Sequence, residues 1–285
     1  MGILWGKQVE QIVDSALSED SVWDDVTTEA LIPPTQVGKA YLCGKSEGVL
    51  AGIGVATMVF HRVDSALKVK ELVADGGRVH PGDRLAAIEG KVASILRAER
   101  AALNFLQRLS GIATETAKYV EAISGTKALV TDTRKTAPGL RILEKYAVRV
   151  GGGCNHRQNL GDGVLVKDNH LVALRSRGVG LGEVIKKARQ HAPHTLKIEV
   201  EVESVEQARE ALSAGADIVM LDNMDLEDMR RVVELAQGQA VIEASGRITL
   251  DSVRAVADTG VDLISVGALT HSAKALDISL ELETK

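Results

Sequence analysis

Short apolar runs rich in β-forming residues alternate with amphipathic segments through the second half of the chain, and this alternation restricts the possible folds most. From residue 128 onward the runs are ALVTD, GVLVKD, LKIEVEV, DIVMLD, AVIEAS and LISVG. The last four end at intervals of 21, 23 and 22 residues, at Glu201, Asp222, Ser245 and Gly267. These intervals are close to the shortest workable strand–helix unit. Six such units with polar residues at the strand ends predict a parallel α/β barrel.

An open, doubly wound sheet is the alternative to the barrel. It is less favoured because no GxGxxG follows any of the runs. The first hundred residues differ in texture and predict an α+β domain. We expect a helix near Val9–Leu17 and strands in KAYLCG, GVLAGI, LKVKELV and RLAAIEG. Two further helices are expected at about Val92–Leu109 and Ala113–Ile123.

Composition excludes several classes of protein. The net charge of −5 and the aromatic content of 2% argue against nucleic-acid binding. The longest apolar run, Gly48 to Phe60, is too short to cross a bilayer, so no membrane association is expected. Cys43 and Cys154 lie far apart without metal-ligand spacing, and the first residues do not resemble a signal peptide. A reducing, cytoplasmic location is therefore predicted.

Cations concentrate in residues 132–170, although the chain as a whole is acidic. They lie at turns and strand ends and not on one helix face, which indicates a pocket for a small molecule with several negative charges. The basic residues of this stretch are Arg134, Lys135, Arg141, Lys145, Arg149, His156, Arg157, Lys167 and His170. Arg141, Lys145 and Arg149 have an alternative place on a helix, LRILEKYAV. Ordinary surface charge is the alternative for the others.

Two further groups follow the strand ends. Glu201 and Asp222 offer oxygen ligands of the kind that hold Mg²⁺ together with substrate phosphates, or else form structural salt bridges to the nearby cations. Ser245, Gly246 and Gly267 sit where barrel loops bind phosphate through backbone N–H groups. Lys167 at a strand end could alternatively form a Schiff base, as in barrel aldolases.

Several longer blocks resemble the quinolinate phosphoribosyltransferases, also called nicotinate-nucleotide pyrophosphorylases (carboxylating). They are DTRKTAPGLR, EKYAVRVGGGCNHR, VKDNH, EVEVES, MLDNM, EASG and SVGALTHS, preceded by DVTTEALIP, EGVLAG and AERAALNFLQRLSGIAT. The resemblance covers nearly the whole chain in the family's order. It implies an N-terminal α+β sandwich domain, at residues 1–112, followed by an incomplete parallel α/β barrel at 113–270. The tail, 271–285, is expected to return to the first domain.

The resemblance also implies an activity and its partners. Members of the family join quinolinate to 5-phosphoribosyl-1-pyrophosphate with Mg²⁺, and they release pyrophosphate and CO₂ to give nicotinate mononucleotide for NAD synthesis. Dimers or larger oligomers are expected, in which Arg100 reaches into the neighbouring subunit's site. Quinolinate is expected to bind to Arg134, His156, Arg157 and Lys167. Phosphoribosyl pyrophosphate and its metal are expected near Lys135, Glu201 and Asp222, with phosphates at Ser245, Gly246, Gly267 and His271. Lys135, Lys167, Glu201 and Asp222 are the expected catalytic residues.

Two positions depart from the family pattern. Arg247 follows Gly246 where the family usually has a second glycine, which puts the phosphate loop in question. Asp24 precedes Asp25 where the family usually has glycine, at a distance in sequence from the predicted chemistry. Two alternative functions remain open at this point. One is a paralogous pyrophosphorylase-like enzyme with another nitrogenous substrate, and the other is a non-catalytic barrel that binds phosphoribosyl groups or other anions.

Overall fold

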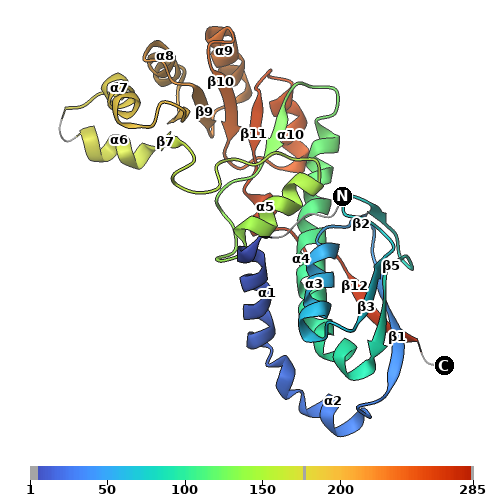
Figure 1. Cartoon of the computed structure of the whole chain (residues 1–285). Helices are drawn as coiled ribbons and strands as arrows, with labels where there is room; N and C mark the ends of the chain where they lie inside the picture. The colour runs from blue at the N-terminus through green and yellow to red at the C-terminus, as the bar shows by residue number, and fades with distance from the viewer. Residues whose placement is uncertain (1–5, 176–177, 284–285) are drawn as a thin grey trace. The chain divides into compact units, whose positions relative to one another are not determined.

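The structure is a computed structural model that describes residues 6–175 and 178–283 of the 285-residue chain (Figure 1). The chain forms two compact units. The first contains the residues up to 117 together with 136–152 and those from 269 onward. The second contains 118–135 and 153–268. Each unit is therefore assembled from segments that are distant in sequence.

The first unit contains a four-stranded antiparallel sheet in the order β12-β1-β5-β3. Its strands are β1 (Val37–Gly44), β3 (Lys68–Glu71), β5 (Arg84–Lys91) and β12 (Ile278–Glu283). A separate ribbon pairs β2 (Gly48–Val49) with β4 (Arg78–Val79). The register of β12 on β1 runs from Lys39 opposite Glu283 to Gly44 opposite Ile278. The end of the chain thus forms an edge strand of the sheet in which β1 lies (Figure 1).

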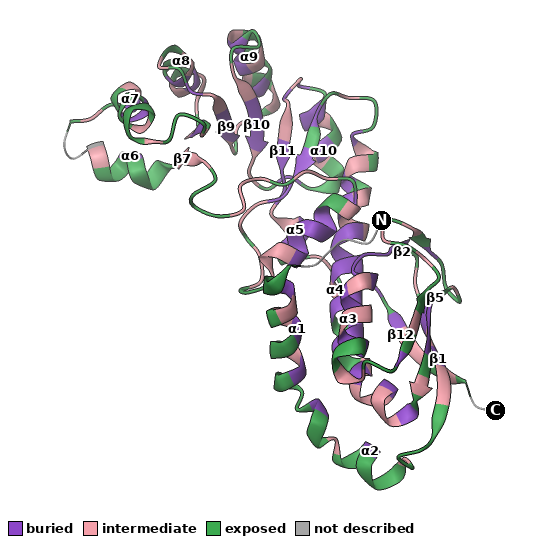
Figure 2. Ribbon diagram, viewed as in Figure 1, coloured by how far each residue is buried: buried purple, intermediate pink, exposed green. Residues whose placement is uncertain are grey.

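The helices of this unit bury regularly spaced apolar residues. They are α1 (Lys7–Glu19), η1 (Val22–Asp24), α2 (Val26–Leu31), α3 (Ile53–Val63), α5 (Arg141–Val150) and the first part of α4 (Val92–Ala122). In α1 the buried residues Val9, Val13 and Leu17 recur every fourth position, which places them on one face of the helix (Figure 2). The predicted helix at Val9–Leu17 is therefore confirmed.

The predicted strand in GVLAGI is wrong beyond its first two residues. Only Gly48–Val49 is extended, and α3 begins at Ile53. Gly52 has φ of +93°, a conformation that residues with a Cβ rarely adopt, and it turns the chain into the helix. The side chain of Asp75 accepts hydrogen bonds from the N–H groups of Gly52 and Ile53 at 2.9 and 3.0 Å, which caps the new helix.

The two helices predicted around Gly111 are one continuous helix, α4, of 31 residues. A Cβ at Gly111 would lie 2.0 Å from the carbonyl oxygen of Lys274, so the missing side chain allows close packing of another segment. The helix continues because its apolar positions repeat on both sides of the glycine, including the buried Leu109, Ile112 and Ala113.

The second unit is built on a six-stranded parallel sheet in the order β6-β11-β10-β9-β8-β7. Its strands are β6 (Leu129–Thr131), β7 (Val164–Val166), β8 (Ile198–Val202), β9 (Ile218–Asp222), β10 (Val241–Ser245) and β11 (Leu263–Ser265). The connecting helices are α6 (Asp168–Arg175), α7 (Leu181–His191), α8 (Val205–Ser213), α9 (Leu226–Ala236) and α10 (Leu250–Ala257), and α11 (Ala268–His271) follows the last strand.

The strand order identifies an incomplete barrel. Strands β7 to β11 neighbour one another in chain order, and the first strand, β6, lies beside the last, β11. That cyclic order is typical of a barrel, whereas a doubly wound sheet reverses its order at an internal strand. Among the described residues, β6 and β7 do not pair with each other, so the barrel is not closed; Cys154 forms an isolated parallel bridge with Thr131 of β6. The predicted fold class is confirmed, and the doubly wound alternative is wrong.

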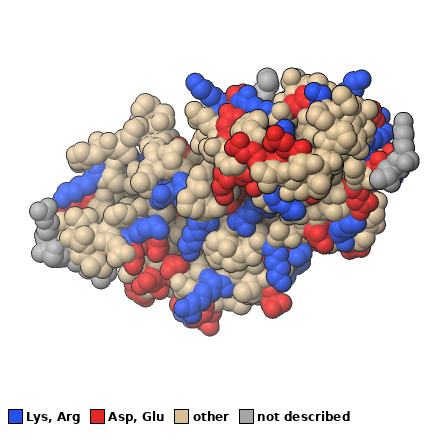
Figure 3. All heavy atoms as spheres, turned by 90° about the horizontal axis from the view of Figure 1, so that it is seen from below, with Lys and Arg blue, Asp and Glu red and all other residues tan. Residues whose placement is uncertain are grey.

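Within the described residues, no helix combines the length and the apolar character that crossing a membrane requires. On the face drawn in Figure 3, Lys and Arg side chains lie among Asp and Glu side chains. This face is therefore not a broad basic surface.

Candidate active site

Acidic and polar side chains meet at the carboxyl ends of β8, β9 and β10. Asp222 and Ser245 are direct register partners at the ends of β9 and β10. Burial, followed by the charge of Asp222, raises the pKa of Glu201 in β8, and the charge of Lys167 lowers it. These effects require the two carboxylates and the ammonium group to lie close to one another. The structure thus brings together Lys167, Glu201, Asp222 and Ser245 at one end of the sheet.

Two arginines lie close together in the same unit. Burial lowers the pKa of Arg157, and the neighbouring charge of Arg134 lowers it further. Nη1 of Arg157 donates to the carbonyl oxygen of Gly163 at 3.1 Å, immediately before β7. Two guanidinium groups in a partly buried place favour a ligand with more than one negative charge, because such a ligand relieves their mutual repulsion.

Asp132 fixes the segment that carries these cations. It follows β6 directly and is fully buried. One carboxylate oxygen accepts from the side-chain amide of Asn155 at 2.6 Å, and the other accepts from the backbone N–H of His156 at 2.9 Å. Backbone hydrogen bonds between Cys154 and the end of β6 hold the same segment to the sheet. Residues 154–156 therefore occupy the open edge of the barrel in a defined position.

Below the strand ends lies an inner group of His156, Glu199 and Glu243. Nδ1 of His156 accepts from the N–H of Arg157 at 2.8 Å, so Nε2 is the protonated nitrogen. Nε2 faces the carboxylate of Glu199 at 3.1 and 3.2 Å, and Glu243 lies 3.7 Å away. Glu243 is fully buried, and neither of its oxygens has a hydrogen-bond partner among the described residues. The imidazole is thus held by contacts on both nitrogens.

The sequence predicts the metal at Glu201 and Asp222, whereas the distances between possible ligand atoms identify a different group of three residues. Within the described chain, His156, Glu199 and Glu243 offer ligand atoms that all lie within 4.8 Å of one another. In this trio, however, Nε2 of His156 is at hydrogen-bonding distance from Glu199, which places a proton between them. Mg²⁺ usually takes only one or two protein carboxylates and completes its shell with water and substrate phosphates. A pair such as Glu201 and Asp222 is sufficient for that arrangement.

The loop after β10 has an unusual backbone. Gly246 has φ of +100°, and a Cβ there would lie 2.5 Å from Oδ1 of Asn223. Arg247, the departure from the family pattern, has φ of +48°. The N–H of Asn223 donates to the carbonyl oxygen of Ser245 at 3.0 Å and joins this loop to the end of β9. Glycine is therefore required at position 246, while Arg247 adopts a left-handed conformation that is uncommon for residues with a side chain.

The remaining predicted residues are placed as follows. Lys135 is exposed, and its N–H donates to Oγ1 of Thr133 at 3.1 Å. Gly267 lies between β11 and α11 in the same unit. Arg100, exposed on α4, and His271, exposed at the end of α11, belong to the other compact unit. Nδ1 of His271 lies 2.6 Å from Oγ of Ser272. The roles of these four residues stay predictions.

Sequence reasoning missed Asp132, Glu199 and Glu243 as parts of the site. The available signal was an acidic residue within an otherwise apolar strand, in IEVEV and in VIEAS. An acid in a buried strand needs a partner, so such a residue marks an interior polar group. Asp132 gave a weaker signal, because an acid directly after a strand is also common in loops.

Two family models together match most of the chain. Residues 25–110 match the family described as quinolinate phosphoribosyl transferase, N-terminal domain, and residues 112–281 match its C-terminal domain. A probable nicotinate-nucleotide pyrophosphorylase [carboxylating] of Bacillus subtilis (strain 168) is 43% identical over 275 residues, which cover 96% of this chain and 93% of that protein. A decarboxylating quinolinate phosphoribosyltransferase of Nicotiana tabacum, designated 2b and mitochondrial, is 41% identical over 97% of this chain and 83% of its own.

Solved structures give the same result. NadC from Streptococcus pyogenes superposes with a TM-score of 0.94 at 44% identity and covers 99% of both chains. The nicotinate-nucleotide pyrophosphorylase from Francisella tularensis has a TM-score of 0.91 at 40% identity, over 97% of this chain and 96% of its own. Both domains, their order and their fold thus agree with one family. This chain belongs to the quinolinate phosphoribosyl transferase family.

Proposed function

We infer that this protein is a decarboxylating quinolinate phosphoribosyltransferase of NAD biosynthesis. It transfers the phosphoribosyl group of 5-phosphoribosyl-1-pyrophosphate to quinolinate and forms nicotinate mononucleotide, pyrophosphate and CO₂. One observation supports this function beyond the family match. The neighbouring cations Arg134 and Arg157 and the group of Lys167, Glu201 and Asp222 belong to one parallel α/β unit. An anionic acceptor and a metal-bound pyrophosphate need these two kinds of group together.

The cations provide the site for quinolinate. Arg134, Arg157 and Lys167 bind its two adjacent carboxylates, with the arginines as bidentate donors. His156 supports this arrangement, because its Nδ1 accepts from the N–H of Arg157 and fixes the backbone there. Nicotinate has only one carboxylate and would leave partly buried cations without a counter-charge. Discrimination against a ligand that lacks a matched polar group can reach roughly 10⁴-fold.

The strand-end loops provide the site for phosphoribosyl pyrophosphate. Ser245, Gly246 and Gly267 offer backbone N–H groups and a hydroxyl to phosphate oxygens. Lys135 and His271 add positive charge or hydrogen-bond donors at the same substrate. The positive φ of Gly246 lets the backbone approach a phosphate closely, which is the reason to place a phosphate at this loop.

The reaction then needs orientation more than acid–base chemistry. The pyridine nitrogen attacks C1 of the ribose as the C1–O bond to pyrophosphate breaks, so the ring nitrogen becomes positively charged. The bond between C2 and its carboxylate then breaks, its electron pair moves toward the charged ring, CO₂ leaves, and a proton from solvent replaces it. The arginines hold the nitrogen in line with C1. Glu201 and Asp222 face the ribose, where positive charge develops, and stabilise it.

Glu201 and Asp222 also fit a bound Mg²⁺. The charge of Asp222 raises the pKa of Glu201, so the two carboxylates repel each other, and a divalent cation would relieve that repulsion. Both donors are hard oxygen ligands, as Mg²⁺ prefers. When bound, the metal offsets the negative charge of the departing pyrophosphate.

We further propose a homodimer in which Arg100 completes the site of the partner subunit. The support is the position of Arg100, exposed on α4, in the block AERAALN that the family shares. Mixing Arg100→Ala with Lys167→Ala should restore activity, because a hybrid dimer contains one intact site. No recovery despite demonstrated subunit exchange would contradict the shared site. A cytoplasmic location stays a prediction.

The first test is release of pyrophosphate and CO₂ from phosphoribosyl pyrophosphate and Mg²⁺, with quinolinate or nicotinate as the acceptor. We expect both products with quinolinate alone. Arg157→Ala should reduce kcat/KM for quinolinate at least 100-fold without lowering Tm. Arg231→Ala is the matched control, since Arg231 forms only exposed ion pairs on α9. Turnover of nicotinate, or no turnover of quinolinate, would contradict the assignment.

A further inference from the structure

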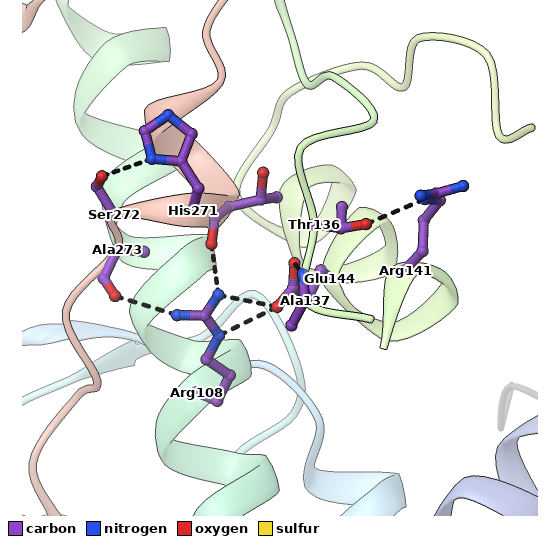
Figure 4. A network of polar contacts seen from close by, with 9 residues as sticks. Arg108, Thr136, Ala137, Arg141, Glu144, His271, Ser272 and Ala273 are labelled. Carbon is purple, nitrogen blue, oxygen red and sulfur yellow. Dashed lines mark hydrogen bonds and ion pairs between the residues drawn. The ribbon is translucent and has the colours of Figure 1, made fainter. Parts of the chain in front are cut away.

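A buried ion pair outside the strand-end site links two segments that carry proposed substrate contacts. Glu144 in α5 is fully buried, and its Oε1 accepts from Nε and Nη2 of Arg108 in α4, at 3.2 and 2.8 Å (Figure 4). Its second oxygen accepts from the N–H of Ala137 at 3.2 Å. Ala137 lies two residues after Lys135. Both oxygens of Glu144 are therefore occupied, one by a cation and one by the backbone of the cationic segment.

Arg108 directs its other hydrogen bonds to the backbone around His271. Nη2 donates to the carbonyl oxygen of Thr270, and Nη1 donates to that of Ala273 at 3.3 Å (Figure 4). These two carbonyl groups stand on either side of His271 in the chain. The planar guanidinium presents its N–H groups in a fixed fork, so the carboxylate and both carbonyls are positioned relative to one another.

The same face of α4 holds the rest of the C-terminal segment through its backbone. Nε2 of the Gln107 side chain donates to the backbone carbonyl oxygen of Ile278 at 2.6 Å. The backbone carbonyl oxygen of Gln107 accepts from the N–H of Leu276 at 2.9 Å. Gly111 allows the backbone at Lys274 to pass within contact distance of the helix. Backbone contacts of this kind fix the path of a segment whatever side chains it carries. The position of His271 is therefore set from α4.

We propose that Arg108 and Glu144 are positioning residues for the phosphoribosyl transfer, which hold the segment after Lys135 and the segment around His271 in their reactive places together. The proposal rests on the proposed function, because that function gives Lys135 and His271 their roles. An ion pair with a buried partner is a poor choice for stability alone, since apolar residues of the same volume often stabilise a fold equally well. Its donors and acceptors are directed at backbone groups of the two segments, which an apolar pair could not hold.

Binding of two unreactive probes tests the proposal in the full-length protein. Phthalate has two adjacent carboxylates without a ring nitrogen, and inorganic pyrophosphate with Mg²⁺ reports on the phosphate end. Arg108→Lys keeps the charge but loses the fork, so we expect the Kd of pyrophosphate to rise at least 10-fold and kcat/KM for phosphoribosyl pyrophosphate to fall about 100-fold. The Kd of phthalate should change less than 2-fold, because neither segment carries a proposed contact to quinolinate. Arg62→Lys is the matched control, because Arg62 pairs with exposed carboxylates of α1 in the same unit. It should change each value less than 2-fold.

Glu144→Gln separates the two segments and also serves if the arginine variant does not fold. The amide oxygen still accepts from Arg108, while its NH₂ group faces the N–H of Ala137 and cannot accept from it. Only the segment after Lys135 is released in this variant, so pyrophosphate binding should weaken at least 3-fold but less than in the R108K protein, while phthalate binding changes less than 2-fold. An unchanged pyrophosphate affinity per folded molecule in the R108K protein, or an equal loss for phthalate, would overturn the proposal, as would a wild-type pyrophosphate affinity in the E144Q protein. If wild-type protein binds both probes without turning over quinolinate, the proposed function fails and the positioning test still stands.

Discussion

The buried carboxyl group of Glu243 should make the stability of this protein depend on pH in a predictable direction. The side chain is fully buried without a hydrogen-bond partner among the described residues. Burial, followed by the charge of Glu199, raises its pKa from 4.5 to about 7, and the nearby His156 opposes the rise. The folded protein therefore binds this proton more tightly than the unfolded chain does. The stabilisation is complete below pH 4.5 and is lost as the pH rises through 7.

The magnitude follows from the difference between the two pKa values. The difference between a pKa of 4.5 in the unfolded chain and one of about 7 in the folded protein corresponds to a loss of about 3 kcal/mol in the free energy of unfolding between pH 4.5 and pH 8. Glu243→Gln keeps the shape of the protonated acid and removes its titration. The variant should therefore gain stability relative to the wild type as the pH rises, by most of this amount between pH 5 and 8.

Urea unfolding at pH 5, 6, 7 and 8 measures this difference, with protein concentration and salt held constant because an oligomer's stability depends on both. Glu234→Gln is the control, since Glu234 is exposed on α9 in the same unit and the substitution is identical. Its curve should stay parallel to that of the wild type. If the curve of the Glu243 variant is parallel as well, the carboxyl group does not titrate in this range, and the reasoning from burial is refuted.

Three further predictions concern the strand-end site. Gly246→Ala places a Cβ 2.5 Å from Oδ1 of Asn223 at a backbone φ of +100°. KM for phosphoribosyl pyrophosphate should therefore rise at least 10-fold in steady-state kinetics, and an unchanged KM would exclude a phosphate contact at this loop. Arg157→Lys should raise KM for quinolinate about 10-fold or more and leave KM for phosphoribosyl pyrophosphate within 2-fold, because the lost fork serves one substrate. Asp222→Asn should raise the Mg²⁺ concentration for half-maximal activity about 10-fold; a curve that superposes on the wild type would show that Asp222 does not hold the metal.

The barrel could be predicted from the sequence because its signals are local. Each apolar run is short, ends at a polar or glycine residue and is followed by an amphipathic segment, and all six runs are strands in the structure. The N-terminal domain was less predictable. GVLAGI has the composition of a strand, but the turn at Gly52 and the cap from Asp75, far along the chain, convert most of it to the start of a helix. Such a cap cannot be recognised without the fold.

Gly111 illustrates a second limit of sequence reasoning. A glycine within a helical pattern indicates either an end of the helix or a place where another segment comes close. Only the contact with Lys274, more than 160 residues later, decides between the two. The apolar repeat on both sides of the glycine favoured continuation. An uninterrupted repeat is therefore better evidence for a helix than a single glycine is against it.

The site residues at strand ends were accessible to sequence reasoning, whereas the groups that hold them were not. Glu201 is the penultimate residue of β8 and Asp222 is the last residue of β9. The carboxyl ends of parallel strands lie at one edge of a sheet, so their proximity follows from the fold alone. Glu199 and Glu243 lie within strands that are not adjacent, β8 and β10, with β9 between them. Their approach depends on side-chain direction across a curved sheet and on His156 reaching between them.

These supporting groups share one physical origin. Glu144, Glu199 and Glu243 are acids with almost no exposed surface, and each costs free energy unless another group compensates its charge or keeps it protonated. A chain of this length has few such residues, because charged side chains are rarely fully buried. For Glu144 the compensating groups are Arg108 and the backbone N–H of Ala137, and for Glu199 the compensating group is His156. Ala137 and His156 belong to segments with proposed substrate contacts. Buried acids therefore mark the places where this fold fixes its site from within.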